Sequence, residues 1–234
     1  MRILSIDTTT TRGSVALSDD AVLIAQEQQG VPGTHSERLI SSIDHLLTTA
    51  GWDRSSIEGI AVAIGPGSFM GLRIGLATAK GMALAIDCPI VGISSLASLS
   101  LNAKHFSGTV VSLIDARRGE IYTFACQFPK KGRQRVLLKE SLLAPALLVK
   151  KLKTIRGELI LVGDGVFTYG DELAKALGAK VIIAQGGLSL SQAINLAILA
   201  LPRFKNGKSD DLAALLPNYI RRSDAEIGFQ GKKK

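Results

Sequence analysis

The feature that most constrains the fold is a pattern that occurs twice, half a chain apart. The segment RILSIDTTTTRGSVAL begins at residue 2, and VVSLIDARRGEIYTFACQF follows the same plan from residue 110. In each, an apolar run ends in Ile-Asp, a polar turn contains Arg-Gly, and a second strand-like run follows. Asp7 and Asp115 lie 108 residues apart in a chain of 234. We therefore expect an internal duplication of a strand-strand-strand-helix unit.

Hydrophobic periodicity supplies the other strands and helices of each unit. In the first half, three short strands precede an amphipathic helix from Thr34 to Gly51, where Thr34 and Glu37 form a capping box. A buried strand over residues 57–65 and an apolar helix follow. Helices are expected in the second half over residues 144–152, 169–178 and 189–204. The expected fold class is α/β, with two lobes that each hold a mixed sheet with packed helices.

The expected domain boundaries follow the duplication. Residues 1–108 form an N-terminal lobe, 109–222 a smaller and more basic C-terminal lobe, and 223–234 a disordered tail. A strand-like segment follows Met1 at once, so we expect no signal peptide. The longest apolar helix pattern, near residues 71–87, is too short and too polar to span a bilayer. Two cysteines far apart in the sequence fit a cytoplasmic location, and no membrane association is expected.

The net charge of +8 comes entirely from the second half of the chain. Residues 1–109 carry 7 basic and 9 acidic side chains, whereas the remaining 125 residues carry 21 and 11. Such an excess can attract a polyanion such as RNA. The candidate contacts are Lys130, Lys131, Arg133 and Lys153. The alternative is a solvated surface, because no aromatic side chains are interleaved to stack on bases.

The stretch GPGSFMGLRIG, residues 65–75, looks like a phosphate-binding loop but departs from every such template. A Walker loop needs a lysine after its last glycine, whereas Leu72 follows Gly71. The dinucleotide fingerprint is one residue too long, because the glycines are spaced G-x-G-x-x-x-G. A serine nucleophile elbow needs a glycine where Pro66 stands. We therefore assign this stretch no catalytic role.

The helix that this stretch begins carries small residues at a spacing of four. One ridge consists of Gly71, Gly75, Ala79 and Ala83, and a second of Arg73, Ala77, Gly81 and Ala85. A glycine inside a helix costs about 0.8–1 kcal/mol relative to alanine, so Gly75 and Gly81 indicate a neighbour close to the helix backbone. We interpret these small residues as a docking surface for another helix. In the alternative interpretation they belong to an ordinary core helix inside one lobe.

The two Asp-containing hairpins resemble those of the actin-like ATPase superfamily, which grip the phosphates and magnesium of ATP from opposite sides. In this chain Thr9 stands where the superfamily has a glycine that lets backbone N–H groups approach a phosphate. Asp7, Thr8 and Asp115 are candidates for a vestigial nucleotide site, unless the two aspartates only cap their turns. An actin-like ATP-dependent phosphotransferase or ATPase is the alternative function. The three histidines form no HxxxH or HExxH pair, so we expect no metal site.

Five motifs, spread over the chain up to about residue 222, carry a closer family resemblance. They are IDTTT, THSERL, GPGSFMGLRIGLATAKGMA, LIDARRGEIY and PNYIRR, in this order. Together they closely resemble the TsaB (YeaZ) family, bacterial proteins of threonylcarbamoyladenosine synthesis on tRNA. The glycine-rich motif is the most specific of the five. Met70 and Ile220 are mild departures, since the family usually has Thr at the first position and often has Leu at the second.

The resemblance implies a non-catalytic scaffold subunit with the actin-like (ASKHA, ribonuclease H-like) fold. In this family the metal and the substrate chemistry reside in a partner, TsaD, which transfers the threonylcarbamoyl group to the adenosine beside the anticodon. The chain would pair with TsaD, or with itself when alone, and the ATPase TsaE would join the complex. The tRNA would be bound through that complex. No cofactor is expected in the isolated chain, and ATP is expected only at an interface with partners, if at all.

The resemblance also places the partner interface on the first two helices of the N-terminal lobe. Carried onto this sequence, the interface comprises Ser36, Glu37, Leu39, Ile40 and Ile43 on the first helix, and Ser68, Phe69, Leu72, Arg73, Gly75, Leu76 and Ala79 on the second.

Overall fold

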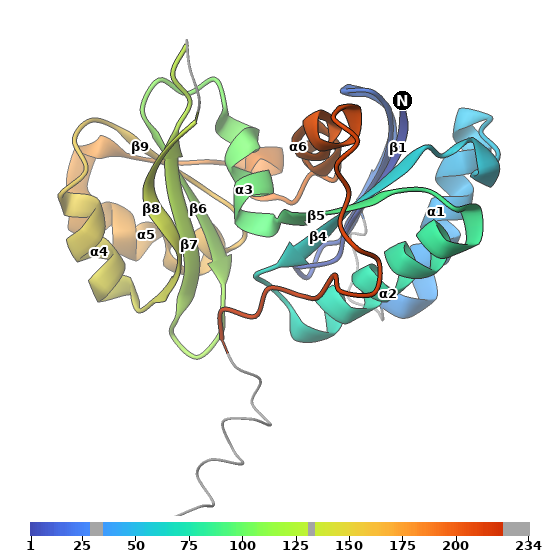
Figure 1. Cartoon of the computed structure of the whole chain (residues 1–234). Coiled ribbons are helices and arrows are strands. Elements are labelled where there is room, and N and C mark those ends of the chain that lie inside the picture. The colour runs from blue at the N-terminus through green and yellow to red at the C-terminus, as the bar shows by residue number, and fades with distance from the viewer. Residues whose placement is uncertain (29–34, 131–133, 222–234) are drawn as a thin grey trace, which may run out of the picture.

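The computed structural model describes residues 1–28, 35–130 and 134–221, and of residues 35–37 it describes the backbone only. The capping box of Thr34 and Glu37 and the tail over 223–234 therefore lie outside the described residues. Within the described part, the strands form two five-stranded sheets, in the orders β3-β2-β1-β4-β5 and β10-β9-β6-β7-β8. Figure 1 shows the two sheets side by side, each with helices of its own.

The two sheets have the same plan. The first contains β1 (Arg2–Asp7), β2 (Ser14–Asp19), β3 (Val22–Gln28), β4 (Gly59–Gly65) and β5 (Ile90–Ser94). The second contains β6 (Thr109–Asp115), β7 (Ile121–Gln127), β8 (Arg135–Leu143), β9 (Leu159–Val162) and β10 (Val181–Ile183). In each, the first three strands form an antiparallel meander, and the fourth and fifth continue in parallel from the first. This correspondence confirms the expected duplication and fold class.

Six α-helices cover the sheets in the described part of the chain. They are α1 (His35–Ala50), α2 (Phe69–Ile86), α3 (Ser95–Ser100), α4 (Pro145–Lys153), α5 (Gly165–Leu177) and α6 (Ile194–Lys205). Short 3-10 turns lie at Arg54–Ser56, Leu101–Ala103, Gly178–Lys180 and Gly186–Ser189. The helix expected from residue 169 thus begins earlier, at Gly165, and the helix expected from residue 189 begins later, at Ile194.

Two of the helices do not follow the expected boundary at residue 108, although the strands do. Helix α3 comes from the first half, yet it packs on β6 and β7 of the second sheet. Helix α6 comes from the second half, yet Leu196, Ala197 and Ala200 pack on β1, β4 and β5 of the first sheet. The two helices lie side by side between the sheets (Figure 1), where the Asn195 amide donates to the carbonyl of Ser98 at 3.0 Å. Each half therefore supplies one helix to the core of the other.

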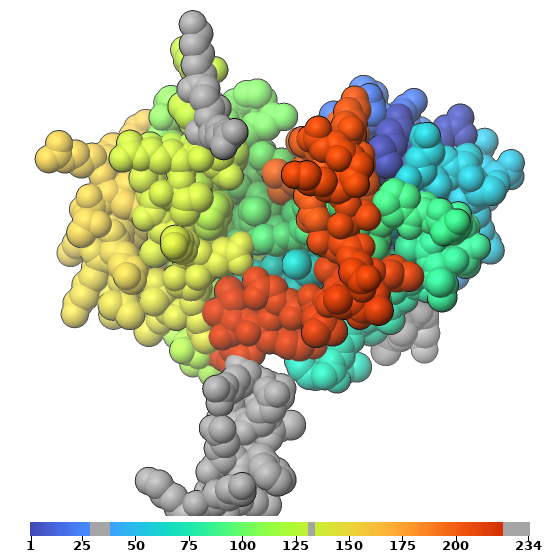
Figure 2. Space-filling model, in the orientation of Figure 1, coloured from blue at the N-terminus to red at the C-terminus, as the bar shows by residue number. Residues whose placement is uncertain are grey.

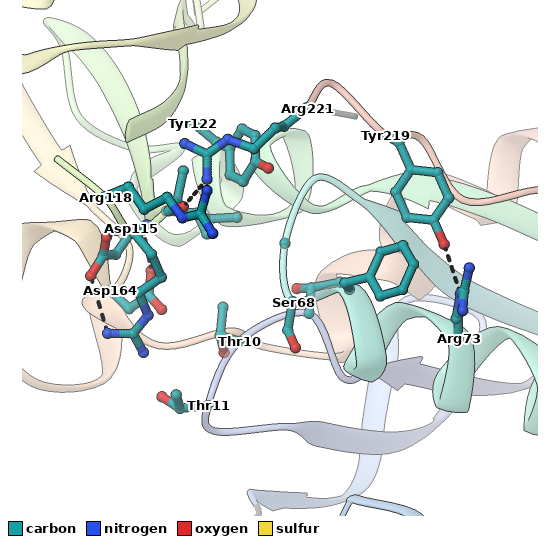
Figure 3. Close-up of a pocket in the computed structure, with 16 residues that line it drawn as sticks. Thr10, Thr11, Ser68, Arg73, Asp115, Arg118, Tyr122, Asp164, Tyr219 and Arg221 are labelled. Carbon is teal, nitrogen blue, oxygen red and sulfur yellow. Dashed lines mark hydrogen bonds and ion pairs between the residues drawn. The ribbon is translucent and has the colours of Figure 1, made fainter. Parts of the chain in front are cut away.

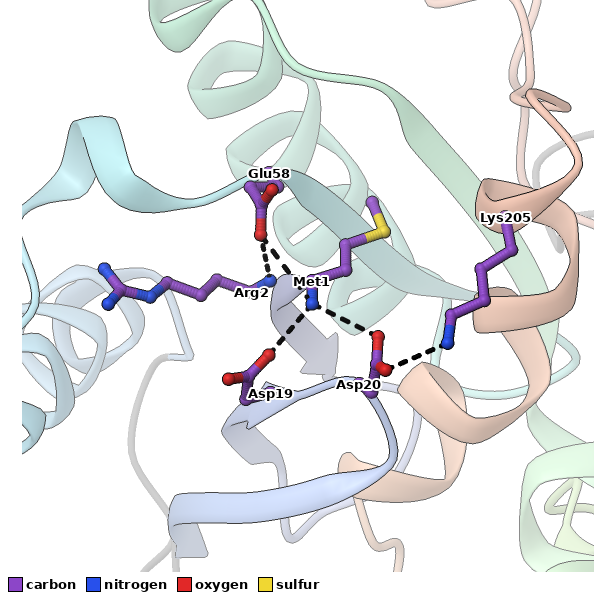
Figure 4. A network of polar contacts seen from close by, with 6 residues as sticks. All are labelled: Met1, Arg2, Asp19, Asp20, Glu58 and Lys205. Atoms are coloured by element: carbon purple, nitrogen blue, oxygen red, sulfur yellow. Dashed lines mark hydrogen bonds and ion pairs between the residues drawn. The ribbon is translucent and has the colours of Figure 1, made fainter.

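Charged groups add to the attachment of α6 to the first lobe. The Lys205 ammonium lies 2.9 Å from Asp20, which also accepts from the Met1 ammonium at 3.1 Å (Figure 4). The same ammonium donates to Asp19 at 2.9 Å. Exposed ion pairs of this kind contribute little to stability, so the buried apolar side chains of α6 provide most of the attachment.

The outer faces of the sheets are covered by the remaining helices. Leu39, Ile43, Leu46 and Leu47 of α1 are buried against the first sheet together with α2. This arrangement confirms the apolar face that periodicity predicts for α1. Helices α4 and α5 cover the outer face of the second sheet through Leu148, Leu152 and Leu173.

Candidate functional site

A cleft of about 640 Å³ lies between the two lobes, where the β1–β2 turn faces the β6–β7 turn. Figure 3 shows its two walls. The first lobe contributes the turn at Thr9 to Thr11 and the start of α2. The second lobe contributes the turn at Asp115 to Arg118, with Asp164 and Arg221 beside it. This is the place where the two Asp-containing hairpins meet, as the duplication predicts.

The carboxylate of Asp7 is fully engaged by the chain itself. Its Oδ1 accepts from the backbone N–H of Thr9 at 2.9 Å and from the Thr9 hydroxyl at 2.6 Å. Its Oδ2 accepts from the hydroxyl of Ser191. With 1% of its surface exposed, Asp7 does not line the cleft. It caps its turn and joins the β1–β2 turn to the segment before α6, which was the alternative interpretation of this residue.

Thr8 is buried as well, and its position explains the glycines of α2. A Cβ on Gly75 would lie 2.2 Å from the Thr8 Oγ1, and one on Gly71 would lie 1.9 Å from the Thr8 carbonyl oxygen. The Thr8 hydroxyl donates to the carbonyl of Gly71 at 2.6 Å. A Cβ on Gly67 would meet the carbonyl of Thr9 at 2.4 Å. The neighbour that these glycines admit is therefore the turn after β1 of the same chain, so the interpretation of this ridge as a docking surface for another helix is wrong.

Asp115 and Asp164 form an acidic pair on the other wall of the cleft. The backbone N–H of Asp115 donates to Asp164 Oδ1 at 3.2 Å, and Asp115 accepts from the backbone N–H of Arg117 at 2.8 Å. Burial raises the pKa of Asp164 to about 6, and the negative charge of Asp115 acts in the same direction. Sequence reasoning missed Asp164, although the GDG that follows the apolar strand LILV was a signal for it.

Arginines give the same wall its positive charge. Arg117 and Arg118 adopt the left-handed conformation, with φ of 60° and 56°, which is unusual for residues other than glycine. The Arg118 side chain points into the cleft (Figure 3). Arg221 donates to the carbonyl of Ala116 at 2.7 Å and pairs with Glu120. The tight β6–β7 turn thus presents guanidinium groups to the space between the lobes.

The outer face of α2 is exposed and, apart from Arg73, apolar, whereas its inner face is buried. Gly71, Leu72, Gly75, Leu76, Ala79 and Ala83 are buried in the first lobe. The second ridge, made of Arg73, Ala77, Gly81 and Ala85, is exposed. A Cβ on Gly81 would meet nothing within 4 Å. We call the exposed residues of this side, Met70, Arg73, Ala77, Gly81, Leu84 and Ala85, the outer face of α2.

Of the residues expected at a partner interface, some are buried in the first lobe and others are exposed. Leu39, Ile43, Leu72, Gly75, Leu76 and Ala79 are buried in the lobe's own core, where they offer no surface to a partner. Ile40, Ser68 and Arg73 are exposed, and Phe69 is half-buried. The side chains of Ser36 and Glu37 lie outside the described residues. Leu84, which is 73% exposed, was not among the residues expected at the interface.

The expected RNA contacts are only partly described. Lys130 and Lys153 are exposed, whereas Lys131 and Arg133 lie outside the described residues. Lys153 is in the last turn of α4 with Lys150 and Lys151, where positive charge also complements the helix dipole. Over the described residues, no three His, Cys, Asp or Glu side chains are grouped in a way that could hold a metal ion.

Comparison with known proteins matches the chain to a family model and to individual proteins with different names, TsaD and TsaB. The family model described as "TsaD: tRNA N6-adenosine threonylcarbamoyltransferase" matches residues 31–229. The chain is 33% identical to the tRNA threonylcarbamoyladenosine biosynthesis protein TsaB of Escherichia coli, with all of both chains covered. The solved structure of YeaZ from Pseudomonas aeruginosa is 27% identical, with a TM-score of 0.76 over 93% of this chain and 99% of that one. A ROK hexokinase from Thermus thermophilus, 14% identical with a TM-score of 0.51 over 88% of this chain and 100% of that one, shares the fold alone.

Proposed function

The chain belongs to the TsaB family, and from this premise we propose that it is a non-catalytic subunit in the formation of threonylcarbamoyladenosine on tRNA. In this proposal it pairs with a TsaD-type transferase and stabilises that enzyme in its active form. The observation that carries the proposal is the exposed, apolar outer face of α2.

The outer face of α2 has the properties of a helix-docking surface. Leu84 is 73% exposed and Met70 61%, and Ile40 of the neighbouring α1 is 49% exposed. Between these side chains, Ala77 and Gly81 leave the helix backbone open to close approach. A helix that is apolar all round is normally buried all round, whereas α2 is covered by its own lobe on one side only. A second subunit would bury the other side.

A protein partner accounts for this face better than a membrane does. Helix α2 is long and apolar enough to cross a bilayer by length and composition, with a mean hydropathy of 1.3 over 18 residues. The sequence-based expectation that this helix is too short and too polar to span a bilayer is therefore wrong as a statement about length and composition. However, Leu72 and Leu76 belong to its buried side, and Thr8 fits against its glycines. Insertion into a membrane would remove these contacts from the lobe, whereas docking of another protein leaves them in place.

The geometry of the hairpins supports a non-catalytic role. In an actin-like ATPase the first hairpin aspartate is available to the metal and phosphates. Here both carboxylate oxygens of Asp7 are hydrogen-bonded to Thr9 and Ser191, and the turn fits tightly against α2. The alternative function, an actin-like phosphotransferase or ATPase, is favoured by the cleft and by Asp115 and Asp164. Calorimetry of the isolated chain with Mg-ATP discriminates between the two, because micromolar binding with turnover would support the alternative.

The proposals about self-association, the TsaE subunit and cellular location rest on membership of the TsaB family. We propose that the chain forms a homodimer when alone, that TsaD displaces the second copy, and that the ATPase TsaE joins the resulting complex. Because both pairings would use the outer face of α2, they would exclude each other. A cytoplasmic location follows from tRNA as the substrate, and Lys130 and Lys153 are the described candidates for contact with it.

The proposed function is tested by reconstitution. Threonylcarbamoyl transfer to tRNA is measured with the TsaD and TsaE homologues, in the presence and absence of this chain. We expect transfer to depend on the chain and to rise until the chain and TsaD are equimolar. Transfer at the full rate without the chain, or with no saturation at equimolar ratio, would contradict the role of a stoichiometric subunit.

A further inference from the structure

After α6 the chain forms an extended strap, residues 206–221, that runs along α2 and ends on the second lobe. Figure 1 shows the strap crossing in front of the first lobe and reaching the lower end of β7. In Figure 2 the same segment covers the front of the junction between the lobes. The strap has no α-helix or long strand of its own, so its position depends on contacts with the rest of the chain.

The first part of the strap is fastened to the first lobe. The backbone N–H of Asp210 donates to the carbonyl of Ile90 at 2.8 Å, and the Asp210 carboxylate accepts from the N–H of Gly92 at 2.8 Å. Leu215 is buried in the core of the first lobe. The ammonium of Lys80, from α2, donates to the carbonyls of Ala213 and Leu215 at 3.3 and 3.2 Å. These contacts fix the strap beside α2.

The last residues of the strap are fastened to both lobes. The backbone N–H of Asn218 donates to the carbonyl of Ile64 at 2.7 Å, and its side-chain amide donates to Glu140 of β8 at 3.3 Å. Ile220 packs against the inner core of the second lobe. Arg221 holds the β6–β7 turn through Ala116 and Glu120. The end of the strap is therefore a tie between the lobes, and it borders the cleft.

The strap also extends the apolar surface of α2. The Tyr219 hydroxyl accepts from the Nε of Arg73 at 3.2 Å, and the Tyr219 ring lies 5.2 Å from that of Phe69. Tyr219 is 40% exposed, and Leu216 is 69% exposed. A helix that docks on the outer face of α2 therefore has the strap at its edge. Tyr219 is two residues from Arg221, so it stands between the docking surface and the tie.

We propose that the partner docked on α2 also covers Leu216 and Tyr219 of the strap, and by this contact holds the two lobes in a fixed relative position. This inference rests on the proposed function. The occupant is the apolar helical surface of the TsaD-type subunit. Covering Tyr219 restrains the chain that leads to Arg221, and through Arg221 it restrains the β6–β7 turn at the cleft. The docking surface for the partner thus comprises the outer face of α2 together with Leu216 and Tyr219 of the strap.

The first test measures affinity for the TsaD homologue by calorimetry. We expect Leu216→Ser to weaken binding about tenfold, because a mostly exposed leucine would become buried in the complex. Leu147→Ser is the matched control, since Leu147 is an exposed leucine on α4 of the second lobe. Leu84→Ser tests the outer face of α2 itself. All three side chains are exposed, so the folded monomer should tolerate each change.

The second test measures hydrogen exchange of the backbone amides in residues 116–120. We expect the TsaD homologue to slow this exchange in the wild-type complex, and to slow it much less in Arg221→Ala at saturating partner. Wild-type affinity in Leu216→Ser, or unchanged exchange on binding, would overturn the inference. If Leu84→Ser alone weakens binding, the inference is wrong and the proposed function stands. If Leu84→Ser binds as the wild type does, the docking surface on α2 is itself refuted.

Discussion

Replacement of glycine by alanine should have opposite effects on the free energy of unfolding at two positions of α2. Gly75 and Gly81 are both interior helix positions, and replacement by alanine at each adds one methyl group. At Gly81 the new Cβ meets nothing within 4 Å, so only the helix propensity changes. We expect Gly81→Ala to raise the free energy of unfolding by about 1 kcal/mol. For a chain of this length that corresponds to a rise of about 2–4 °C in Tm.

At Gly75 the same methyl group would lie 2.2 Å from the Thr8 hydroxyl oxygen, which must then move. Its movement disrupts the 2.6 Å hydrogen bond to the carbonyl of Gly71, at a cost of about 1–3 kcal/mol. Displacement of the packed turn adds about 1–3 kcal/mol. After the gain in helix propensity of about 1 kcal/mol is subtracted, Gly75→Ala should be destabilised by about 1–5 kcal/mol.

Thermal and urea unfolding of the two variants beside the wild type measure this difference. The expected order of stability is Gly81→Ala, wild type, Gly75→Ala. Equal stability of the two variants would refute the close contact of Thr8 with α2. A Gly75→Ala protein that is monomeric, stable and unable to bind TsaD would instead restore the interpretation of Gly75 as an interface residue.

The remaining predictions concern buried charge and the basic surface. Asp7→Ala should lower the free energy of unfolding by about 2–4 kcal/mol in urea titrations, since Thr9 and Ser191 lose their buried acceptor; a change below about 0.5 kcal/mol would contradict this assignment. In the folded chain the pKa of Asp164 is raised from 3.8 to about 6, so as pH rises the carboxyl group loses its proton in the unfolded chain first. Asp164 therefore lowers the free energy of unfolding as pH rises from about 4 to 6. Asp164→Asn should remove that fall and be more stable at pH 7 by up to about 3 kcal/mol; the same pH dependence in the variant would be evidence against burial as the cause. If the basic stretch contacts tRNA, charge reversal at Lys130 and Lys153 should weaken tRNA binding by the complex and flatten its salt dependence by about one unit of slope per lost phosphate contact; unchanged affinity would assign these lysines to a solvated surface.

The duplication and the strands were predictable from the sequence because they depend on local patterns. The repeat of Ile-Asp with a polar turn, 108 residues apart, gives both hairpins and hence two equivalent sheets. The apolar spacing of Leu39, Ile43 and Leu46 gives the buried face of α1. Such patterns show which residues are buried, but they do not show which element buries them.

The contacts that were missed join distant parts of the chain. Thr8 and Gly71 are 63 residues apart, and the glycine spacing alone fits a partner helix as well as it fits the chain's own turn. Similarly, the apolar face of α6 gives no sign that it packs on the first sheet. The strap carries no periodic pattern, so its contacts with Lys80 and Arg73 are visible only in the folded chain.

One binding measurement tests whether the TsaD-type subunit docks on the outer face of α2. The affinity of the TsaD homologue is compared for the wild type and for Gly81→Leu, which places a large side chain where the monomer has open space. We expect a folded variant, at least as stable as the wild type, whose binding is weakened by about a hundredfold or more. A folded Gly81→Leu protein that binds the TsaD homologue with wild-type affinity would show that the outer face of α2 is not the docking surface.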